Sequence, residues 1–354
     1  MKTYLITGGA GFVGSSIAIR IKRDKEDTRI IALDNLRRRG SELNINRLKS
    51  CGVEFVHGDI RNREDIDSVG KIDCFIECSA EPSVLAGYEG SPEYVVNTNL
   101  VGTLNCLELA RKNGADFIFL STSRVYPMKT INGLNYIERE TRYELKSDQS
   151  VVGASSKGYT EDFPLIGTRS LYGATKLASE YIIQEYLEMY SLRGVINRCG
   201  VLTGPWQMGK VDQGFVVLWI ANHIYDKQLS YIGYGGGGKQ VRDILHVDDL
   251  YRLINLELEG LDKLNDQIFN VGGGREISVS LKELTALTQE ITGNRIKIKG
   301  IKEERPGDIR SYISDNSKVT GMTGWRPSIK VEDIVREIAN WISSNMELLR
   351  PVLG

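Results

Sequence analysis

A tyrosine and a lysine four residues apart, Tyr172 and Lys176, are the side chains of this sequence with the clearest chemical use. They open a run to residue 190 whose apolar residues recur at helical spacing, so both are expected on one face of a helix. A free phenol has a pKa near 10, which must fall by roughly 3 before it acts as a base near neutrality. A lysine ammonium one turn away can supply much of that fall. Because this spacing also occurs on ordinary helix surfaces, its meaning depends on whether the chain holds a nicotinamide.

A glycine-rich turn near the amino terminus offers a site for such a cofactor. A strand pattern over residues 2–7 runs into this turn, and an apolar helix follows it to residue 21. The glycines permit a tight turn and a close approach of the backbone to a pyrophosphate, which the helix N-terminus attracts. The strand before and the helix after favour a dinucleotide site over a plain glycine-rich turn. The residues expected to line this site are Gly8, Gly11, Phe12, Val13 and Gly14.

The end of the second expected strand, residues 29–33, selects between NAD and NADP. Asp34 follows this strand, and its carboxylate can accept from ribose hydroxyls while it repels a 2′-phosphate. Asn35 is expected beside it in the cofactor site. Three arginines at 37–39 favour the opposite choice if they grip a phosphate, or they form a solvated loop. A carboxylate at the strand end discriminates more directly, so the sequence predicts NAD.

Further strand patterns over residues 54–57, 74–78 and 117–120 alternate with helical ones, which predicts an α/β fold with a doubly wound parallel sheet of the Rossmann type. Ligands of such sheets lie at the carboxyl ends of the strands, where the sequence places Asp59, Ile60, Ser79, Ala80 and Thr122. Asp59 can meet the adenine amino group with Ile60 on the ring, and it can also cap a helix that opens near residue 62, since the two roles are compatible. Asn99, in a helical pattern over 93–112, either steadies the turns around the cofactor or belongs to a polar helix face.

With 354 residues, the chain is long enough for one large α/β domain and a smaller lobe. We assign residues 1–198, with a return segment at about 239–260, to a Rossmann domain, and 199–354 mainly to a smaller α/β lobe. Residues 126–169 are polar, turn-rich and too long for an ordinary connection. They are expected to form a lid or a wall of the substrate site, with disorder as the alternative. Later helices are expected near residues 281–292 and 331–344.

The amino-acid composition limits the kinds of binding partner and cellular location that we expect for this protein. The formal net charge of −1 gives no electrostatic reason to expect nucleic acid or an anionic membrane. Five scattered cysteines fit reduced thiols in a cytosol better than a disulfide framework, and Cys74 and Cys78 lack the further ligands of a metal site. The first residues enter a strand pattern without a signal sequence, and no apolar run approaches the roughly 18 residues of a membrane span. We therefore expect a cytoplasmic protein without a bound metal.

Taken in order, the glycine loop, Asp34, Thr122 and the Tyr172/Lys176 pair resemble the extended short-chain dehydrogenases/reductases, in the branch of nucleotide-sugar epimerases and dehydratases. The resemblance covers nearly the whole chain and implies an enzyme that binds NAD and a nucleotide sugar. It implies that Tyr172 removes a sugar hydroxyl proton, which it shares with the Thr122 hydroxyl. Lys176 would hold the cofactor ribose and lower the tyrosine pKa. Hydride would leave for the nicotinamide and return to the other face of the keto-sugar, so the cofactor would stay bound.

Segments of the loop and the carboxyl-terminal lobe resemble one group in that branch, the CDP-paratose 2-epimerases, also called CDP-tyvelose epimerases. These segments are residues 140–143, 161–165, 170–176, 212–214 and 238–243 with His246. The likeness implies that Arg242 and Arg305 hold the diphosphate and that Asp308 holds a nucleotide ribose. A local ion pair of Arg242 with Asp243, and a plain surface charge at Arg305, are the alternatives. Further substrate contacts are implied for Ser123, Arg124, Asn197 and Gln213.

Departures from the branch limit the reaction. Its dehydratases carry an Asp-Glu pair where this chain has Ser123 and Arg124. These positions therefore provide no acid that could protonate a leaving hydroxyl, so dehydration is disfavoured. Glu81 and Pro127 also depart from the branch, without an evident consequence.

The sequence therefore predicts an NAD-dependent epimerase of a nucleotide-linked hexose, with CDP-paratose inverted at C2 as the favoured substrate. A UDP-hexose 4-epimerase and a non-catalytic NAD-binding regulatory protein are the alternatives. The family further implies a homodimer through helices 93–112 and 170–190, or a homotetramer.

Overall fold

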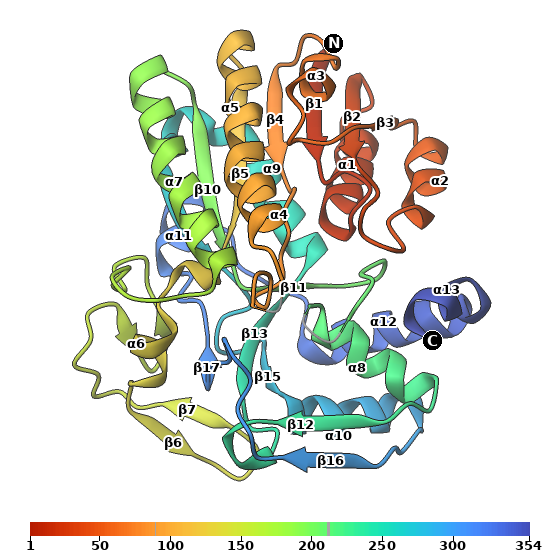
Figure 1. Cartoon of the computed structure of the whole chain (residues 1–354), viewed down its shortest axis with the longest axis vertical. Coiled ribbons are helices and arrows are strands. Elements are labelled where there is room, and N and C mark those ends of the chain that lie inside the picture. The colour runs from red at the N-terminus through yellow and green to blue at the C-terminus, as the bar shows by residue number, and fades with distance from the viewer. Residues whose placement is uncertain (89, 211–212) are drawn as a thin grey trace. The chain divides into compact units, whose positions relative to one another are not determined.

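The computed structural model describes residues 1–88, 90–210 and 213–354, which form two compact units (Figure 1). Unit 1 comprises residues 1–125, 170–198 and 250–269. Unit 2 comprises residues 126–169, 199–249 and 270–354. Asp212, in one of the segments that carry the resemblance, lies outside the described residues.

Unit 1 is built on a seven-stranded sheet in the order β14-β10-β5-β4-β1-β2-β3. The strands are β1 Lys2–Thr7, β2 Thr28–Asp34, β3 Glu54–His57, β4 Cys74–Glu77, β5 Asp116–Thr122, β10 Gly194–Cys199 and β14 Gln267–Val271. β1 pairs in parallel with β2 and β4, β2 with β3, and β4 with β5. The predicted doubly wound parallel sheet is confirmed, and the strand order reverses between β1 and β4, where such sheets bind ligands.

Helices follow most of these strands. They are α1 Phe12–Asp24, α2 Leu43–Ser50, α3 Arg63–Asp67, α4 Glu93–Val96, α5 Gly102–Asn113 and α7 Leu171–Tyr190. A π-helical turn over Asn97–Val101 joins α4 to α5, where one continuous helix is predicted. Helix α9, Val247–Leu264, gives its residues from 250 onward to this unit.

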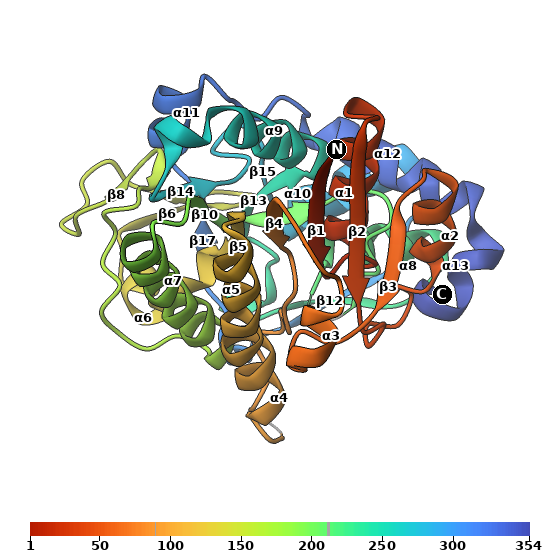
Figure 2. The same cartoon turned by 90° about the horizontal axis from the view of Figure 1, so that it is seen from above.

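The strands at the centre of the sheet are buried on both faces. β4 and β5 are buried at every residue, and β1 at every residue after the first, as expected for parallel strands covered by helices. Figure 2 shows α5 and α7 on one face of the sheet and α1 and α9 on the other. Phe75 and Phe117, with ring centroids 5.3 Å apart, share a buried cluster with Leu107 of α5 and Ile183 of α7. This cluster fixes the helix that carries the Tyr172/Lys176 pair.

Unit 2 holds a four-stranded sheet in which β13 Val241–His246 pairs with β11 Val201–Thr203, β15 Ser278–Ser280 and β17 Ser311–Tyr312. It also contains three strand pairs, β6 Tyr136–Glu138 with β7 Tyr143–Leu145, β8 Ala154–Ser155 with β9 Gly158–Tyr159, and β12 Leu229–Ile232 with β16 Ile298–Ile301. Its helices are α6 Met128–Asn132, α8 Phe215–Ile224, α10 Leu281–Thr292, α11 Ser317–Thr323, α12 Val331–Ser344 and α13 Met346–Leu353.

The compact units differ from the predicted domains in two places. Residues 126–169 group with unit 2, where they form α6 and two short strand pairs. The segment that returns to unit 1 is 250–269 rather than 239–260, because β13 pairs within unit 2. That unit 1 binds NAD and unit 2 the nucleotide sugar stays a prediction.

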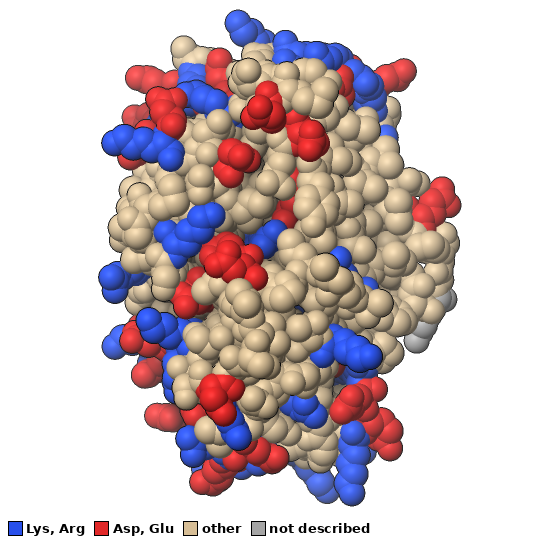
Figure 3. Space-filling model, turned by 90° about the vertical axis from the view of Figure 1, so that its left-hand side faces the viewer, with Lys and Arg blue, Asp and Glu red and all other residues tan. Residues whose placement is uncertain are grey.

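Several general properties of the described residues bear on possible partners. None of their helices combines the length and the apolar composition that crossing a membrane requires. Within the same ranges, no three His, Cys, Asp or Glu side chains gather in a way that would hold a metal ion. No disulfide joins the five cysteines, all of which lie within the described ranges. On the face shown in Figure 3, basic and acidic side chains are interspersed over the surface.

A buried carboxylate makes the stability of unit 1 depend on pH. Glu257 of α9 is fully buried and accepts a hydrogen bond from the Asn197 amide at 2.9 Å. Burial raises the pKa of Glu257 from 4.5 to about 8, against the opposite effect of the Asn197 bond. Between these values the folded chain keeps a proton that the unfolded chain releases, so stability falls as the pH rises.

We predict that Glu257→Gln removes this dependence. Relative to the wild type, the free energy of unfolding of the variant should rise by up to about 1.4 kcal/mol for each pH unit within this window. The gain should level off above about pH 8. Urea unfolding at a series of pH values measures it, and a difference that stays constant with pH would contradict the prediction.

Candidate active site

The loop between β1 and α1 is shaped by glycines that leave no room for a side chain. Gly8 has a left-handed backbone with φ +62°, and a Cβ there would lie 2.9 Å from the carbonyl carbon of Cys78. A Cβ on Gly14 would lie 2.3 Å from the Gly8 oxygen. Helix α1 begins at Phe12, after Gly11, so its first amides have no helical acceptor and can bind an anion. This narrow cradle fits the pyrophosphate of a dinucleotide.

Asp34 ends β2 against this loop. Its Oδ2 accepts from the Ala10 and Gly11 amides at 3.1 and 3.2 Å, and its Oδ1 from the Leu36 amide at 2.8 Å. Burial raises the pKa of Asp34, and the three backbone bonds act against that rise. A carboxylate has about four acceptor positions, so one remains for a ribose hydroxyl. Asp34 therefore shapes the loop and keeps capacity for the predicted ribose contact.

Asn35 and Asp59 are joined at the ends of β2 and β3. The Asn35 amide donates to Asp59 at 2.9 Å, and the Arg61 guanidinium donates to the same oxygen at 2.6 Å. Burial raises the pKa of Asp59, but the bonds from Arg61 and Asn35 outweigh it and bring the value to about 2. Arg37 lies over the Tyr94 ring, 3.9 Å from its centroid. Within unit 1, the Asn35 and Asp59 side chains therefore bond to other residues of the protein.

The structure excludes one interpretation of Asp59, that its side chain caps the start of α3. The side chain of Asn62 caps this helix by accepting from the Glu64 amide, so Asp59 is not the cap. Ile60 is buried at 4% exposure, and a Cβ on Gly102 of α5 would lie 2.6 Å from its Cδ1. Its side chain therefore packs against α5, and the contact with an adenine ring stays a prediction.

Asn99 holds the turn that follows β4. Its Oδ1 accepts from the Glu81 amide at 2.8 Å, and its Nδ2 donates to the Glu81 carbonyl at 3.1 Å. The same Nδ2 lies 3.2 Å from Thr175 Oγ1 on α7. Ser79 and Ala80 precede this turn, and the Ser79 amide lies against Gly8. Fully buried in the π-helical turn, Asn99 thus ties the segment below the glycine loop to the helix of Tyr172.

Thr122 is the last residue of β5 and is mostly buried. Its Oγ1 accepts from the Arg124 amide at 3.2 Å, which begins a 3-10 turn over Ser123–Val125. Ser123 and Arg124 are partly exposed on this turn. Because β5 is parallel to β4 and β4 to β1, the Thr122 hydroxyl lies at the same edge of the sheet as the glycine loop.

Tyr172 and Lys176 lie on the first two turns of α7, as predicted. The helix begins after Ser170, whose Oγ accepts from the Gly173 amide at 3.3 Å. Tyr172 is partly exposed, whereas Lys176 is buried at 1% exposure. The Lys176 ammonium lies over Phe119 of β5, 3.8 Å from the ring centroid, and α7 packs against β5 and the turn after it. The helix therefore presents a partly open phenol and a buried cation beside the end of β5.

Asn197 has no evident role toward a ligand. It is fully buried in β10, and its amide donates to Glu257. The predicted substrate contact finds no support in this placement.

In unit 2, Arg242 and Asp308 meet. The Arg242 guanidinium donates to Asp308 Oδ1 at 2.8 Å and to the carbonyl of Val241 at 2.8 Å. Asp308 Oδ2 also accepts a hydrogen bond from the side-chain amide of Gln240 at 3.3 Å. Arg242 therefore does form an ion pair, as one of the alternatives predicted, but its partner is Asp308 rather than Asp243. Two of the five guanidinium donors are used in these bonds, so an anion can still be bound.

Arg305 and Asp308 are the two ends of one turn. The Asp308 amide donates to the Arg305 carbonyl at 3.3 Å, across Pro306 and Gly307, whose φ is +78°. Gln213 pairs with Lys210 through two backbone bonds of 2.7 and 3.1 Å. Asp308 thus connects Arg242 of β13 with the turn that begins at Arg305, and neither of the two backbone bonds of Gln213 involves these residues.

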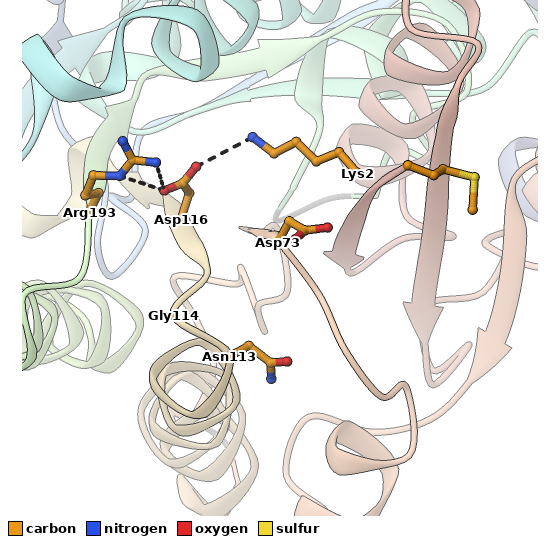
Figure 4. A pocket seen from close by; sticks show the side chains of 7 residues that line it. Lys2, Asp73, Asn113, Gly114, Asp116 and Arg193 are labelled. Atoms are coloured by element: carbon orange, nitrogen blue, oxygen red, sulfur yellow. Dashed lines mark hydrogen bonds and ion pairs between the residues drawn. The ribbon is translucent and has the colours of Figure 1, made fainter.

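A surface cavity of about 430 Å³ lies at the opposite end of the strands in unit 1. It is lined by residues at or near the amino ends of β1, β4, β5 and β10, namely Met1, Lys2, Asp73, Asn113, Gly114, Asp116 and Arg193 (Figure 4). Asp116 is held there by Arg193 at 2.7 Å and Lys2 at 3.6 Å. Because ligands of doubly wound sheets bind at the carboxyl ends, we do not place the active site in this cavity.

Two residues near the glycine loop and the end of β4 were not among the site residues predicted from the sequence. Gly9 is one, since a Cβ there would lie 2.6 Å from the Ala32 Cα of β2. The sequence feature that could have indicated Gly9 is a small residue in the turn after the first strand together with a small residue, Ala32, in the second strand. Glu77 is the other, a fully buried carboxylate at the end of β4. Its signal is a charged residue inside an apolar strand pattern.

The comparisons with known proteins fit this arrangement. Residues 4–272 match the NAD dependent epimerase/dehydratase family. The chain is 31% identical to CDP-paratose 2-epimerase of Salmonella typhi, over 96% of this chain and 99% of that protein. It is 26% identical to dTDP-glucose 4,6-dehydratase of Salmonella typhimurium, over 98% of this chain and 94% of that protein. The structure of UDP-glucose 4-epimerase of Thermotoga maritima with UDP-glucose aligns with a TM-score of 0.77 at 26% identity, covering 97% and 99% of the two chains.

The chain therefore belongs to the NAD dependent epimerase/dehydratase family. The resemblance to the extended short-chain dehydrogenases/reductases is confirmed, and so is NAD as the cofactor. The protein is an enzyme of the class that epimerises or dehydrates nucleotide sugars.

We predict that Gly14→Ala abolishes tight NAD binding. The new Cβ would meet the Gly8 oxygen at 2.3 Å, and only a shift of the loop relieves this contact. NAD released from the denatured protein should fall by about tenfold or more, equivalent to at least about 1.4 kcal/mol of binding free energy. Gly260→Ala is the matched control, since its Cβ would meet only the Leu264 side chain at 3.5 Å. Equal NAD contents in the two variants would refute the role of the loop.

Proposed function

We propose that this protein is an epimerase that inverts C2 of CDP-paratose or of a closely related CDP-linked hexose. The observation that carries this proposal is the 31% identity, over 96% of the chain, to CDP-paratose 2-epimerase. The Thr122, Tyr172 and Lys176 set supports it from the structure of unit 1. A Rossmann fold alone supports no particular reaction, since the same fold serves many functions.

The proposed chemistry begins with Tyr172 as the base. Its phenolate takes the proton of the sugar hydroxyl, and the Thr122 hydroxyl shares that proton through a hydrogen bond. Lys176, one helical turn away, stabilises the phenolate and holds the cofactor ribose. When bound, NAD accepts the hydride of the carbinol carbon and gives it back. Tyr172 then returns its proton to the oxygen, so that no net oxidation occurs.

Inversion requires the keto-sugar to receive the hydride on its other face. The sugar must therefore turn while the diphosphate stays held. Arg242, Arg305 and Asp308 of unit 2 are the proposed anchors, because a guanidinium binds phosphate oxygens through bidentate, charge-assisted bonds. The Asp308 carboxylate accepts from a nucleotide ribose in this proposal.

Dehydration is the less favoured reaction for this site. It needs an acid that protonates a leaving hydroxyl, and the turn after Thr122 carries Ser123 and Arg124 instead. A serine hydroxyl and a guanidinium are both far too weakly acidic for that step.

Two alternatives remain distinct from the proposal. Inversion at C4 of a UDP-hexose fits the same Tyr172 chemistry and is favoured by the likeness to UDP-glucose 4-epimerase. A non-catalytic NAD-binding regulator fits less well, since a sensor has no use for an activated phenol. NMR of the product separates the two epimerase reactions, because only the inverted centre changes.

We predict that Tyr172→Phe lowers turnover of CDP-paratose by about 10³-fold or more, because the phenyl ring cannot accept the hydroxyl proton. Bound NAD should remain near one per chain, since the glycine loop and Asp34 are unchanged. Tyr181→Phe, on the exposed side of the same helix, is the matched control and should keep full activity. The role given to Tyr172 is wrong if the Tyr172→Phe enzyme retains most of its activity.

We further propose that the chain is a homodimer through α5 and α7. Leu104 of α5 is 38% exposed, and Tyr181 and Met189 of α7 are 53% and 66% exposed. The two helices pack side by side in unit 1, so these apolar side chains form part of one outer surface. Exposed apolar surface of this kind is typical of association sites.

The double variant Leu104→Glu with Tyr181→Glu is predicted to be monomeric, because two charges would be buried without partners at the interface. Ile166→Glu is the control, since Ile166 is 91% exposed but belongs to unit 2. Analytical ultracentrifugation measures the masses. A dimer that survives the double change would place the interface elsewhere.

A further inference from the structure

Glu77 is an unusual residue for its position. It ends β4, whose four residues are all buried, and its own side chain has no exposed surface. Burying a carboxylate costs several kcal/mol unless bonds or charges compensate. An apolar residue would fill this place in a parallel strand at no such cost. The charge of Glu77 therefore needs a reason.

The hydrogen bonds of Glu77 satisfy it only in part. Thr103 Oγ1 of α5 lies 2.7 Å from Glu77 Oε1 and 2.9 Å from the Asn99 carbonyl. A hydroxyl has one hydrogen, so Thr103 can donate to only one of these two acceptors. Oε2 has no hydrogen-bond partner among the described residues. When Glu77 is charged, Thr103 donates to its carboxylate; when Glu77 is protonated, it can donate to Thr103, which then donates to the Asn99 carbonyl.

Lys176 is a cation whose charge acts on this carboxylate and lowers its pKa. Phe119 is the residue of β5 directly beside Glu77 in the sheet. The Lys176 ammonium lies over that same Phe119 ring, 3.8 Å from its centroid. Both charged groups are buried, so little water screens their interaction.

The other groups around Glu77 add little charge. Beside it in the sheet, β1 presents the Thr7 hydroxyl and β5 presents Phe119. Helix α5 contributes Thr103 and the Cys106 thiol, whose pKa burial raises and the Glu77 charge raises further. Helix α7 contributes Lys176. Burial raises the pKa of Glu77 to about 7, although Lys176 and Thr103 act to lower it.

We propose that Glu77 is a positioning residue whose charge keeps Lys176 protonated and sets the pH range in which Tyr172 works as a base. The inference rests on the proposed roles of Tyr172 and Lys176. Because its side chain has no exposed surface, Glu77 is proposed to act through the lysine. Thr103, which lies within bonding distance of Glu77, also lies 2.9 Å from the Asn99 carbonyl, and the Asn99 side chain donates to Thr175 of the same helix as the lysine.

Electrostatics gives the direction of the effect. A negative charge raises the pKa of every group near it, because it favours the protonated form. Its removal therefore lowers the pKa of the Lys176 ammonium. The lysine then loses its charge at lower pH, and the phenolate loses the cation that stabilises it. Because burial raises the pKa of Glu77 to about 7, its charge is present mainly above that pH, so the alkaline limb of the pH profile of turnover must move in the acid direction.

The first test compares Glu77→Gln with Glu257→Gln. Both replace a fully buried glutamate of unit 1 that accepts one side-chain hydrogen bond, and in both the amide oxygen can keep that bond. We expect the alkaline limb of the kcat profile for CDP-paratose to shift by about one pH unit toward acid in Glu77→Gln. The profile of Glu257→Gln should match the wild type, since Lys176 does not contribute to the pKa of Glu257. If the alkaline limb of the Glu77→Gln profile stays in place, the proposal is overturned.

A second test needs no turnover. In protein labelled with ¹³C-glutamate, Glu77 and Glu257 are expected to titrate far above other glutamates, and loss of a signal in Glu257→Gln leaves the one from Glu77. Lys176→Met should raise the midpoint of that signal, because the ammonium favours the carboxylate. An unchanged midpoint overturns the proposal even if Glu77→Gln does not fold. If CDP-paratose is not a substrate, the proposed function fails, and this titration still decides the role of Glu77.

Discussion

The site of unit 1 depends on one steric constraint, the close packing of backbone at the point where the strand order reverses. Gly8 lies so near the Cys78 carbonyl, and Gly14 so near Gly8, that no side chain fits at either position. This packing brings the end of β1, the start of α1 and the turn after β4 together. Asp34 then bonds to two amides of the same loop, and Asn99 holds the turn below it.

A second layer of the site is electrostatic. Unit 1 buries a lysine and a carboxylate near one another beside a partly open tyrosine. In water each charge would be screened, and the phenol would keep its usual pKa near 10. In the dry interior a single ammonium acts strongly on its neighbours, so small changes in its own charge state matter. The sheet supplies this environment because β4 and β5 are covered on both faces.

The sequence was sufficient where local patterns decide the structure. The predicted ranges of β1, β3 and α12 agree with the structure residue for residue, because strong apolar periodicity and strand ends define them. Helix α13 was missed, since Pro351 argues against a helix although Leu349 and Leu353 are buried in it. The π-helical turn at Asn97–Val101 was also missed, because no local spacing distinguishes it from an α-helix.

The positions of the candidate site residues in the fold could be predicted only where a motif fixes them. The glycine loop and the Tyr172/Lys176 pair lie where their spacing predicts. The orientations of Ile60 and Asn197 depend instead on α5 and α9, which are distant in the sequence, so both side chains proved to be buried. For Glu77 the strand pattern gave a buried position, but the lysine that justifies its charge is known only from the fold.

The central claim is that NAD held by unit 1 is reduced transiently by a sugar carbinol and oxidised again on the same enzyme. Rapid mixing of the purified protein with CDP-paratose, followed at 340 nm, tests it most directly. The account predicts about one NAD per chain before mixing and an absorbance that rises and then settles as the epimers equilibrate. Protein that binds NAD but shows neither this absorbance nor an inverted product, with CDP-linked or UDP-linked hexoses, would contradict it.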